Sequence, residues 1–111
     1  MEENNIFLSV VIPAYNEEKR ILQTLCLIDK YFTGKGIKYE VVVVDDGSKD
    51  NTIRVIDNFI SGKDNMRLLK NGQNRGKGHA VKRGVLEAKG EYILFSDADL
   101  ATPIQESEKL I

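Results

Sequence analysis

Two carboxylates one residue apart, Asp97 and Asp99, are the residues of this sequence best suited to chemistry. They follow Tyr92–Phe95, a short run of aromatic and branched side chains that begins after Gly90 and predicts a strand buried on both faces. Open parallel sheets bind ligands at the carboxyl ends of their strands, where an Asp-x-Asp can supply two oxygen ligands to a phosphate-bound divalent cation. A solvated acidic turn is the alternative interpretation, because short acidic loops after strands are common.

The elements that must position this pair alternate between strand and helix along the chain. Four apolar runs predict strands at residues 8–12, 39–44, 66–69 and 92–95, and Pro13 is expected to end the first because it lacks a backbone donor. Apolar residues at helical spacing between these runs predict helices that flank an open parallel sheet, which is an α/β fold. The apolar positions expected on the first helix are Ile21, Leu22, Leu25, Cys26, Ile28 and Phe32, and those on the third are Ala80, Val81, Gly84, Val85 and Ala88.

Polar side chains follow three of the four predicted strands. Asn16 and Glu17 come after the first strand, Asp45 and Asp46 follow the second, and the Asp-x-Asp pair follows the fourth. Because the carboxyl ends of parallel strands meet at one edge of a sheet, we expect these loops to share one rim. Chance is a poor explanation for so many carboxylates on one edge, so the pattern favours a functional site over separate solvated turns.

A glycine-rich turn at residues 71–78 precedes the third predicted helix and differs from the known nucleotide-binding loops. A Walker loop has four residues between its first Gly and the Gly-Lys pair, whereas this turn has three, and a dinucleotide fingerprint would need glycine where Val81 stands. The turn is therefore interpreted only as the start of a helix, with exposed backbone amides beside Arg75 and Lys77. Binding of a diphosphate and simple exposure to solvent explain these residues equally well. The sole histidine, His79, is expected to support this loop and not to act as a general base.

Length, composition and charge limit the class of protein. The 111 residues allow one domain, and 41% apolar with 30% charged residues are typical of a soluble globular chain. A net charge of −1 gives no support for nucleic-acid binding, and no apolar run approaches the roughly 20 residues of a membrane span. The acidic, polar first five residues do not resemble a signal peptide, and the single cysteine, Cys26, fits a reducing compartment and core packing. We therefore expect a cytoplasmic protein, or a full-length form at the cytoplasmic membrane face.

Four motifs carry a resemblance to a known family: SVVIPAYNEE at 9–18, VVDDGSKDNT at 43–52, NRGKGHA at 74–80 and SDAD at 96–99. In this order they closely resemble the N-terminal half of family-two glycosyltransferases of the GT-A fold. The nearest subgroup resembles the dolichyl- or polyprenyl-phosphate sugar transferases, which are hexosyltransferases. The resemblance implies a Rossmann-like GT-A sheet in which residues 1–111 form the nucleotide-sugar-binding half of the domain, with the acceptor half absent.

The resemblance also implies roles in binding a nucleotide-diphosphate sugar. The first loop would lie against the base and ribose, with Tyr15 offering a ring face and Glu17 an acceptor for ribose hydroxyls. Asp46 would accept a hydrogen bond from the ring N–H of the base, and Asp45 would orient the loop. The residues implied to bind the nucleotide sugar are Pro13, Ala14, Tyr15, Glu17, Asp46, Lys77, Asp97 and Ala98.

The same resemblance implies a metal ion at the Asp-x-Asp pair. Asp97 would face the ribose or the metal, and Asp99 would bind Mg²⁺ or Mn²⁺ directly, so that the cation neutralises the leaving diphosphate as a Lewis acid. Mannose synthases of this group often carry Gln at the position of Ala101. The sequence therefore looks more like the glucosyltransferase branch and favours a UDP-sugar over GDP-mannose.

Family members carry the acceptor site and any catalytic base after the Asp-x-Asp stretch, and this chain stops at Ile111. The resemblance therefore implies a donor-binding half with no catalytic residue of its own, inactive alone, from an enzyme that glycosylates a lipid phosphate or a glycan. Without later strands, Tyr92–Phe95 would be an exposed apolar edge, and we expect a homo-oligomer formed through it. A non-catalytic nucleotide-binding or interaction module of the same fold is the main alternative. A sugar nucleotidyltransferase is disfavoured, because its basic glycine-rich loop would follow the first strand.

Overall fold

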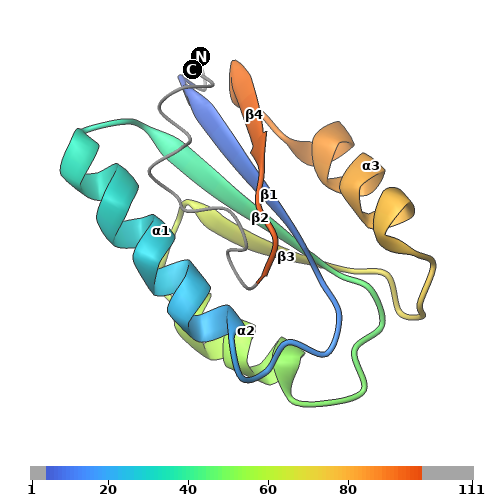
Figure 1. Cartoon of the computed structure of the whole chain (residues 1–111). Helices are drawn as coiled ribbons and strands as arrows, with labels where there is room; N and C mark the ends of the chain where they lie inside the picture. Colours follow the sequence, from blue (N-terminus) through green and yellow to red (C-terminus); the bar gives the residue numbers. More distant parts are fainter. Residues whose placement is uncertain (1–4, 99–111) are drawn as a thin grey trace.

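The predicted strands form one parallel sheet with helices on both faces (Figure 1). The structure is a computed structural model and describes residues 5–98. The strands are β1 (Leu8–Ala14), β2 (Tyr39–Asp45), β3 (Met66–Lys70) and β4 (Tyr92–Phe95), and the helices are α1 (Ile21–Lys35), α2 (Thr52–Ile60) and α3 (Lys77–Glu87). The strand order is β3-β2-β1-β4, and each neighbouring pair is parallel. The predicted open α/β sheet is therefore confirmed.

Helices lie on both faces of the sheet because both sets of alternating strand side chains are apolar. One face packs against α1 and α2, and the other packs against α3, as Figure 1 shows. Burial on both sides explains why the central strands are continuous apolar runs in the sequence. Strand residues in the larger core on the α1 and α2 side include Leu8, Val10, Ile12, Val41, Val43 and Met66. The cluster on the α3 side comprises Val42, Val44 and Ala80.

Strand β1 continues through Pro13 to Ala14, beyond its predicted end. The carbonyl of Ala14 accepts a hydrogen bond from the Asp46 amide at 2.8 Å, so the backbone groups of Ala14 face β2. Successive residues of a strand direct their backbone groups to opposite sides, so the nitrogen of Pro13 faces away from β2 and toward the β4 side of the strand. On that side β4 pairs with β1 only as far as Val11. The absence of an N–H on Pro13 therefore removes no hydrogen bond between strands. The expectation that Pro13 ends the strand is wrong.

Strand β4 lies at the edge of the sheet, since within residues 5–98 it pairs with β1 alone. Tyr92 is 48% exposed and Phe95 is 53% exposed, while Leu94 packs against the larger core. The prediction of a strand buried on both faces is therefore wrong, because α3 packs over β1 and β2. The second expectation for this strand, an exposed apolar edge, is confirmed.

Helix α1 turns a narrower apolar face to the sheet than its sequence predicts. Leu22 is 46% exposed and Cys26 is half-buried, so these two residues lie at or beyond the margin of the buried face. Thr24 lies on the buried face instead and donates its hydroxyl to the carbonyl of Ala98. None of the helices in the described part of the chain is long and apolar enough to cross a membrane.

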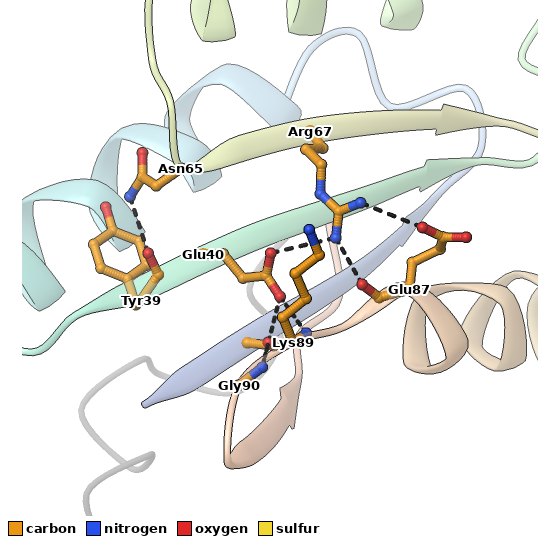
Figure 2. Close-up of polar contacts among 8 residues, drawn as sticks. Tyr39, Glu40, Asn65, Arg67, Glu87, Lys89 and Gly90 are labelled. Carbon is orange, nitrogen blue, oxygen red and sulfur yellow. Dashed lines mark hydrogen bonds and ion pairs between the residues drawn. The ribbon is translucent and has the colours of Figure 1, made fainter. Parts of the chain in front are cut away.

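A buried carboxylate ties the amino-terminal ends of three strands together (Figure 2). Glu40, only 4% exposed, accepts hydrogen bonds at Oε2 from the Ser9 hydroxyl at 2.6 Å and from the Lys89 amide at 2.7 Å. Its Oε1 pairs with Arg67, which also donates to the carbonyl of Glu87 at 2.7 Å. Because a buried charge is costly unless it is paired, this network fixes β1, β2, β3 and the segment before β4 relative to one another.

Helix α3 approaches the sheet closely at Gly84. A Cβ at this position would lie 2.4 Å from Val11 Cγ1 and 3.3 Å from Val44 Cγ2. Both valines are fully buried, so neither side chain has space to move away. The predicted small-residue face of α3 therefore brings the helix onto β1 and β2 and places its first turn at their carboxyl ends.

The variant Gly84→Ala is expected to lower the free energy of unfolding by about 1–3 kcal/mol, because overpacking outweighs the better helix propensity of alanine. Urea denaturation measures this loss. Gly34→Ala in α1 is the matched control, since its Cβ meets nothing within 4 Å, and it should be neutral or stabilising by up to about 1 kcal/mol. Equal stability of the two variants would contradict the proposed close contact.

Candidate functional site

A cleft of about 410 Å³ opens at the carboxyl ends of β1, β2 and β4, beside the start of α3. All eight residues expected to bind a nucleotide sugar line this cleft, so the structure brings the complete predicted set together. Three further lining residues, Asn74, Gly76 and Ala80, are not among those that the sequence predicts to bind a ligand. The eight residues are Pro13, Ala14, Tyr15, Glu17, Asp46, Lys77, Asp97 and Ala98.

The loop after β1 is fastened to the loop after β2 by hydrogen bonds. Asn16, which has a left-handed φ of 54°, donates its amide to the Ser48 hydroxyl at 2.8 Å and accepts from the Lys49 amide at 2.8 Å. Asparagine tolerates this backbone conformation better than most residues. The Glu17 amide donates to Thr52 Oγ1 at 2.8 Å. These bonds hold the neighbouring side chains of the first loop at the cleft.

Asp45 is fully buried and organises the loop that follows it. One carboxylate oxygen accepts the amides of Gly47 at 3.1 Å and Ser48 at 2.9 Å, and the other accepts the Ser48 hydroxyl at 2.5 Å. The residue therefore satisfies three donors of its own turn and has no exposed surface in the cleft. The expectation that Asp45 orients this loop is confirmed.

Asp46 connects the same loop to the glycine-rich turn, a role that was not predicted. Its Oδ1 accepts from Asn71 Nδ2 at 2.8 Å and from the Arg75 amide at 2.9 Å, and its Oδ2 accepts from the Gly76 amide at 2.9 Å. The two loops also touch through their backbones, since a Cβ on Gly47 would lie 2.5 Å from the carbonyl carbon of Gln73. Asp46 thus anchors the loop that leads into α3.

The hydrogen bonds of Asp46 keep its carboxyl group ionised. Burial raises the pKa of this group, but the backbone N–H of Arg75, the Asn71 side chain and the backbone N–H of Gly76 more than offset it. Its pKa therefore lies below the ordinary value of 3.8. A carboxylate that is 4% exposed is thus held negatively charged at the wall of the cleft.

Lys77 and Asp97 form an ion pair at the cleft, with Nζ and Oδ1 2.9 Å apart. Lys77 lies in the first turn of α3, where the free amides of the helix also favour negative charge. Both side chains are well exposed, so their attraction is screened by solvent and the pair is free to rearrange. The site therefore places one cation and one anion side by side where a charged ligand would enter.

The described part of the expected metal site is incomplete. Asp97 contributes a hard oxygen donor at the cleft, which suits Mg²⁺ or Mn²⁺. Asp99 and Ala101 lie outside the described residues. Within residues 5–98, no three His, Cys, Asp or Glu side chains gather in a way that could hold a metal ion.

The sequence predicts a solvated side for Lys82 and Arg83 of α3 and for Lys89 just beyond it, because all three fall off the small-residue face, but their surroundings differ. Lys82 and Lys89 are exposed, in agreement with a solvated face, but Arg83 is partly buried. Its Nη1 donates to the carbonyl of Lys70 at 2.7 Å and to Asn71 Oδ1 at 2.9 Å. The interpretation of Arg83 as a solvated residue is therefore wrong. His79 is exposed in the first turn of α3, and its charge helps to lower the pKa of Asp46.

Solved structures with this arrangement define the fold as that of the GT-A glycosyltransferases. A mannosyltransferase from Pyrobaculum calidifontis, in complex with GDP-Man and Mn²⁺, is 29% identical and superposes with a TM-score of 0.79 over 95% of this chain and 31% of its own. Staphylococcus aureus TarS 1-349, in complex with UDP-GlcNAc, is 35% identical with a TM-score of 0.76 over 85% of this chain and 27% of its own.

The chain belongs to the family described as Glycosyl transferase family 2, which matches residues 9–111. This match confirms the resemblance carried by the four motifs. A dolichyl-phosphate beta-glucosyltransferase from Saccharomyces cerevisiae is 45% identical over 116 residues, which cover 99% of this chain and 35% of that protein. The chain thus spans about a third of the length of this relative.

The variant Asp46→Asn is expected to lower the free energy of unfolding at pH 7 by about 1.5–3 kcal/mol, the usual size for hydrogen bonds to a buried charged group. The amide group would set an N–H against the donors that the carboxylate now accepts. Because the folded pKa lies below the ordinary 3.8, the stabilisation by Asp46 is complete above about pH 4 and is lost as pH falls through the folded pKa.

Urea unfolding of both proteins at pH 7 and pH 2.5 measures this effect, and the difference between them should shrink at the lower pH. Asp57→Asn on the exposed side of α2 is the control and should change stability by less than about 0.5 kcal/mol at both values. An Asp46→Asn difference that stays constant with pH would contradict the ionised role.

Proposed function

We propose that the cleft binds a nucleoside-diphosphate sugar as the donor of a glycosyl transfer. The observation that carries the proposal is the gathering of loops from three strands and the start of α3 around one cleft of about 410 Å³. A cavity of this size accommodates a ligand of several hundred daltons. The family match and the nucleotide sugars bound by the two solved neighbours support the same class of ligand.

The first loop and Asp46 are proposed to bind the base and the ribose. Tyr15, which is partly exposed, offers a ring face for stacking, and Glu17 offers an acceptor for ribose hydroxyls. Asp46 carries negative charge at the cleft wall, and a carboxylate there can accept from the N–H of a base. Pro13 and Ala14 form the backbone floor beneath these groups, at the end of β1.

Lys77, Asp97, Ala98 and Asp99 are proposed to hold the diphosphate end of the donor with a divalent cation, Mg²⁺ or Mn²⁺. When bound, the cation would neutralise the charge that develops on the leaving diphosphate. Asp97 would supply an oxygen ligand, and Lys77 would exchange its contact with Asp97 for a phosphate oxygen. The positive end of α3 favours the same phosphate position.

A UDP-sugar is proposed over GDP-mannose as the donor. Support comes from Ala101, which stands where mannose synthases of the group often carry Gln, and from the glucosyltransferase relative. The proposed acceptor of the full-length protein is a lipid phosphate such as dolichyl phosphate, or a glycan. For residues 1–111 alone we propose donor binding without transfer, because they span about a third of the relative's length.

Isothermal titration calorimetry with UDP, GDP and NAD, each with and without Mn²⁺, tests the donor site. UDP is expected to bind more tightly than GDP, NAD is expected not to bind, and Mn²⁺ should strengthen UDP binding about tenfold or more through its contacts with the diphosphate. Asp97→Asn and Asp99→Ala should abolish most of the Mn²⁺ effect, while Asp57→Asn should retain it. If neither UDP nor GDP binds, the proposal is wrong. The alternative, a non-catalytic module of the same fold, would then bind a different ligand.

We also propose that the chain self-associates through the exposed edge of β4, whose outer side has no strand partner within residues 5–98 and can pair with a second copy. Multi-angle light scattering should show a dimer or larger species whose population rises with concentration. Ile93→Lys should shift the equilibrium toward monomer, and Leu27→Lys on the exposed side of α1 should not. A clean monomer at high concentration would count decisively against this edge.

A further inference from the structure

Arg83, Asn71 and Asp46 form a hydrogen-bonded series that runs from α3 to the cleft. Arg83 Nη1 donates to Asn71 Oδ1 at 2.9 Å, and Asn71 Nδ2 donates to Asp46 Oδ1 at 2.8 Å. Asp46 lines the cleft, but neither Arg83 nor Asn71 does. The series therefore connects the supporting structure to a residue of the proposed site.

The chemistry of the three groups allows one orientation of the central amide. An arginine guanidinium can only donate hydrogen bonds, and an ionised carboxylate can only accept them. The Asn71 side chain must therefore present its oxygen to Arg83 and its nitrogen to Asp46. Reversal of the amide would set donor against donor at one end and acceptor against acceptor at the other.

Hydrogen bonds to the backbone fix Arg83 and Asn71 in this series. Arg83 Nη1 also donates to the carbonyl of Lys70 at 2.7 Å, which ties α3 to the end of β3. The Asn71 amide donates to the carbonyl of Asp45 at 2.9 Å, which ties the turn after β3 to the end of β2. Because Arg83 and the Asn71 backbone are both held in place, the Asn71 side chain has little freedom to turn away from Asp46.

The two oxygens of Asp46 are consequently occupied to different extents. Oδ1 accepts two hydrogen bonds, from Asn71 and from the Arg75 amide, whereas the hydrogen bond from the Gly76 amide goes to Oδ2. A carboxylate oxygen has two lone-pair directions, so Oδ2 keeps acceptor capacity that Oδ1 does not. A half rotation of the carboxyl group would only exchange two equivalent oxygens, whereas a quarter rotation would break these hydrogen bonds.

We infer that Arg83 and Asn71 are positioning residues that hold the Asp46 carboxylate in the orientation that receives the base of the donor. The inference rests on the proposed nucleotide site and adds two residues to it that lie outside the cleft. Arg83 acts through Asn71, and Asn71 acts directly on Asp46. The amides of Arg75 and Gly76 depend on the same orientation, since both donate to this carboxylate.

Arg83→Met tests the inference, because methionine keeps an apolar stem but removes every donor. UDP affinity measured by calorimetry should fall about tenfold, the usual size for one hydrogen bond to a charged group. In the ligand-free protein, the amide resonances of Arg75 and Gly76 should move upfield in a ¹H–¹⁵N correlation spectrum as their bonds to Asp46 weaken. Asn71→Ala should reproduce both effects.

Arg83→Lys should restore most of the UDP affinity and both amide shifts, because an ammonium group can donate to the Lys70 carbonyl and to Asn71 Oδ1. Lys82→Met is the matched control on the same helix, since it removes the same charge from an exposed position, and it should behave as the unchanged protein. A residue that matters only for packing would not be rescued by lysine.

Unchanged amide resonances of Arg75 and Gly76 in Arg83→Met would overturn the inference, and so would moved resonances with unchanged UDP affinity. Failure of the unchanged protein to bind UDP or GDP would instead refute the proposed function. In that event the amide resonances of the ligand-free variants still decide whether Arg83 and Asn71 position Asp46.

Discussion

The demand of two buried carboxylates for hydrogen-bond donors shapes the whole rim of the sheet. Asp45 is the last residue of β2 and Asp46 follows it, and burial makes an unpartnered charge very costly at both positions. Asp45 takes its donors from its own turn, and Asp46 takes them from the turn that follows β3. One adjacent pair of residues thereby determines the paths of two loops, and the cleft lies between the elements that these loops position.

Two carboxylates, one near each end of strand β2, have different roles. Glu40 near the amino end is neutralised by Arg67 and by the hydroxyl and amide donors around it, so its charge serves the assembly of the sheet. Asp46 just beyond the carboxyl end has hydrogen-bond donors as partners and keeps a net negative charge beside the cleft. A carboxylate thus stabilises the sheet near one end of the strand, and another provides negative charge beside the cleft at the other end.

Much of the fold and the set of cleft residues could be predicted, because both depend on local patterns. Apolar runs and helical spacing predict the alternating elements, and parallel pairing then brings the ends of the strands together. The surroundings of Pro13, Leu22 and Arg83 are not predictable in this way, because they depend on neighbours distant in sequence. The end of the β1–β4 pairing before Pro13 and the Arg83 contact with Asn71 leave no periodic signal. The polar residues Ser9 and Glu40 inside apolar runs are the visible signs of this buried network.

The loops after β1 and β2 are joined side by side through Asn16 with Ser48, Glu17 with Thr52, and Glu18 with Asn51. Each bond is formed within the protein itself and requires no ligand. A molecule that enters the cleft therefore meets a wall whose conformational entropy has already been lost during folding, and its contact energy is not spent on ordering that wall. Such preorganisation favours recognition by fixed shape, in which the rigid spacing of these two loops, and not their closure around a ligand, sets the selectivity of the cleft.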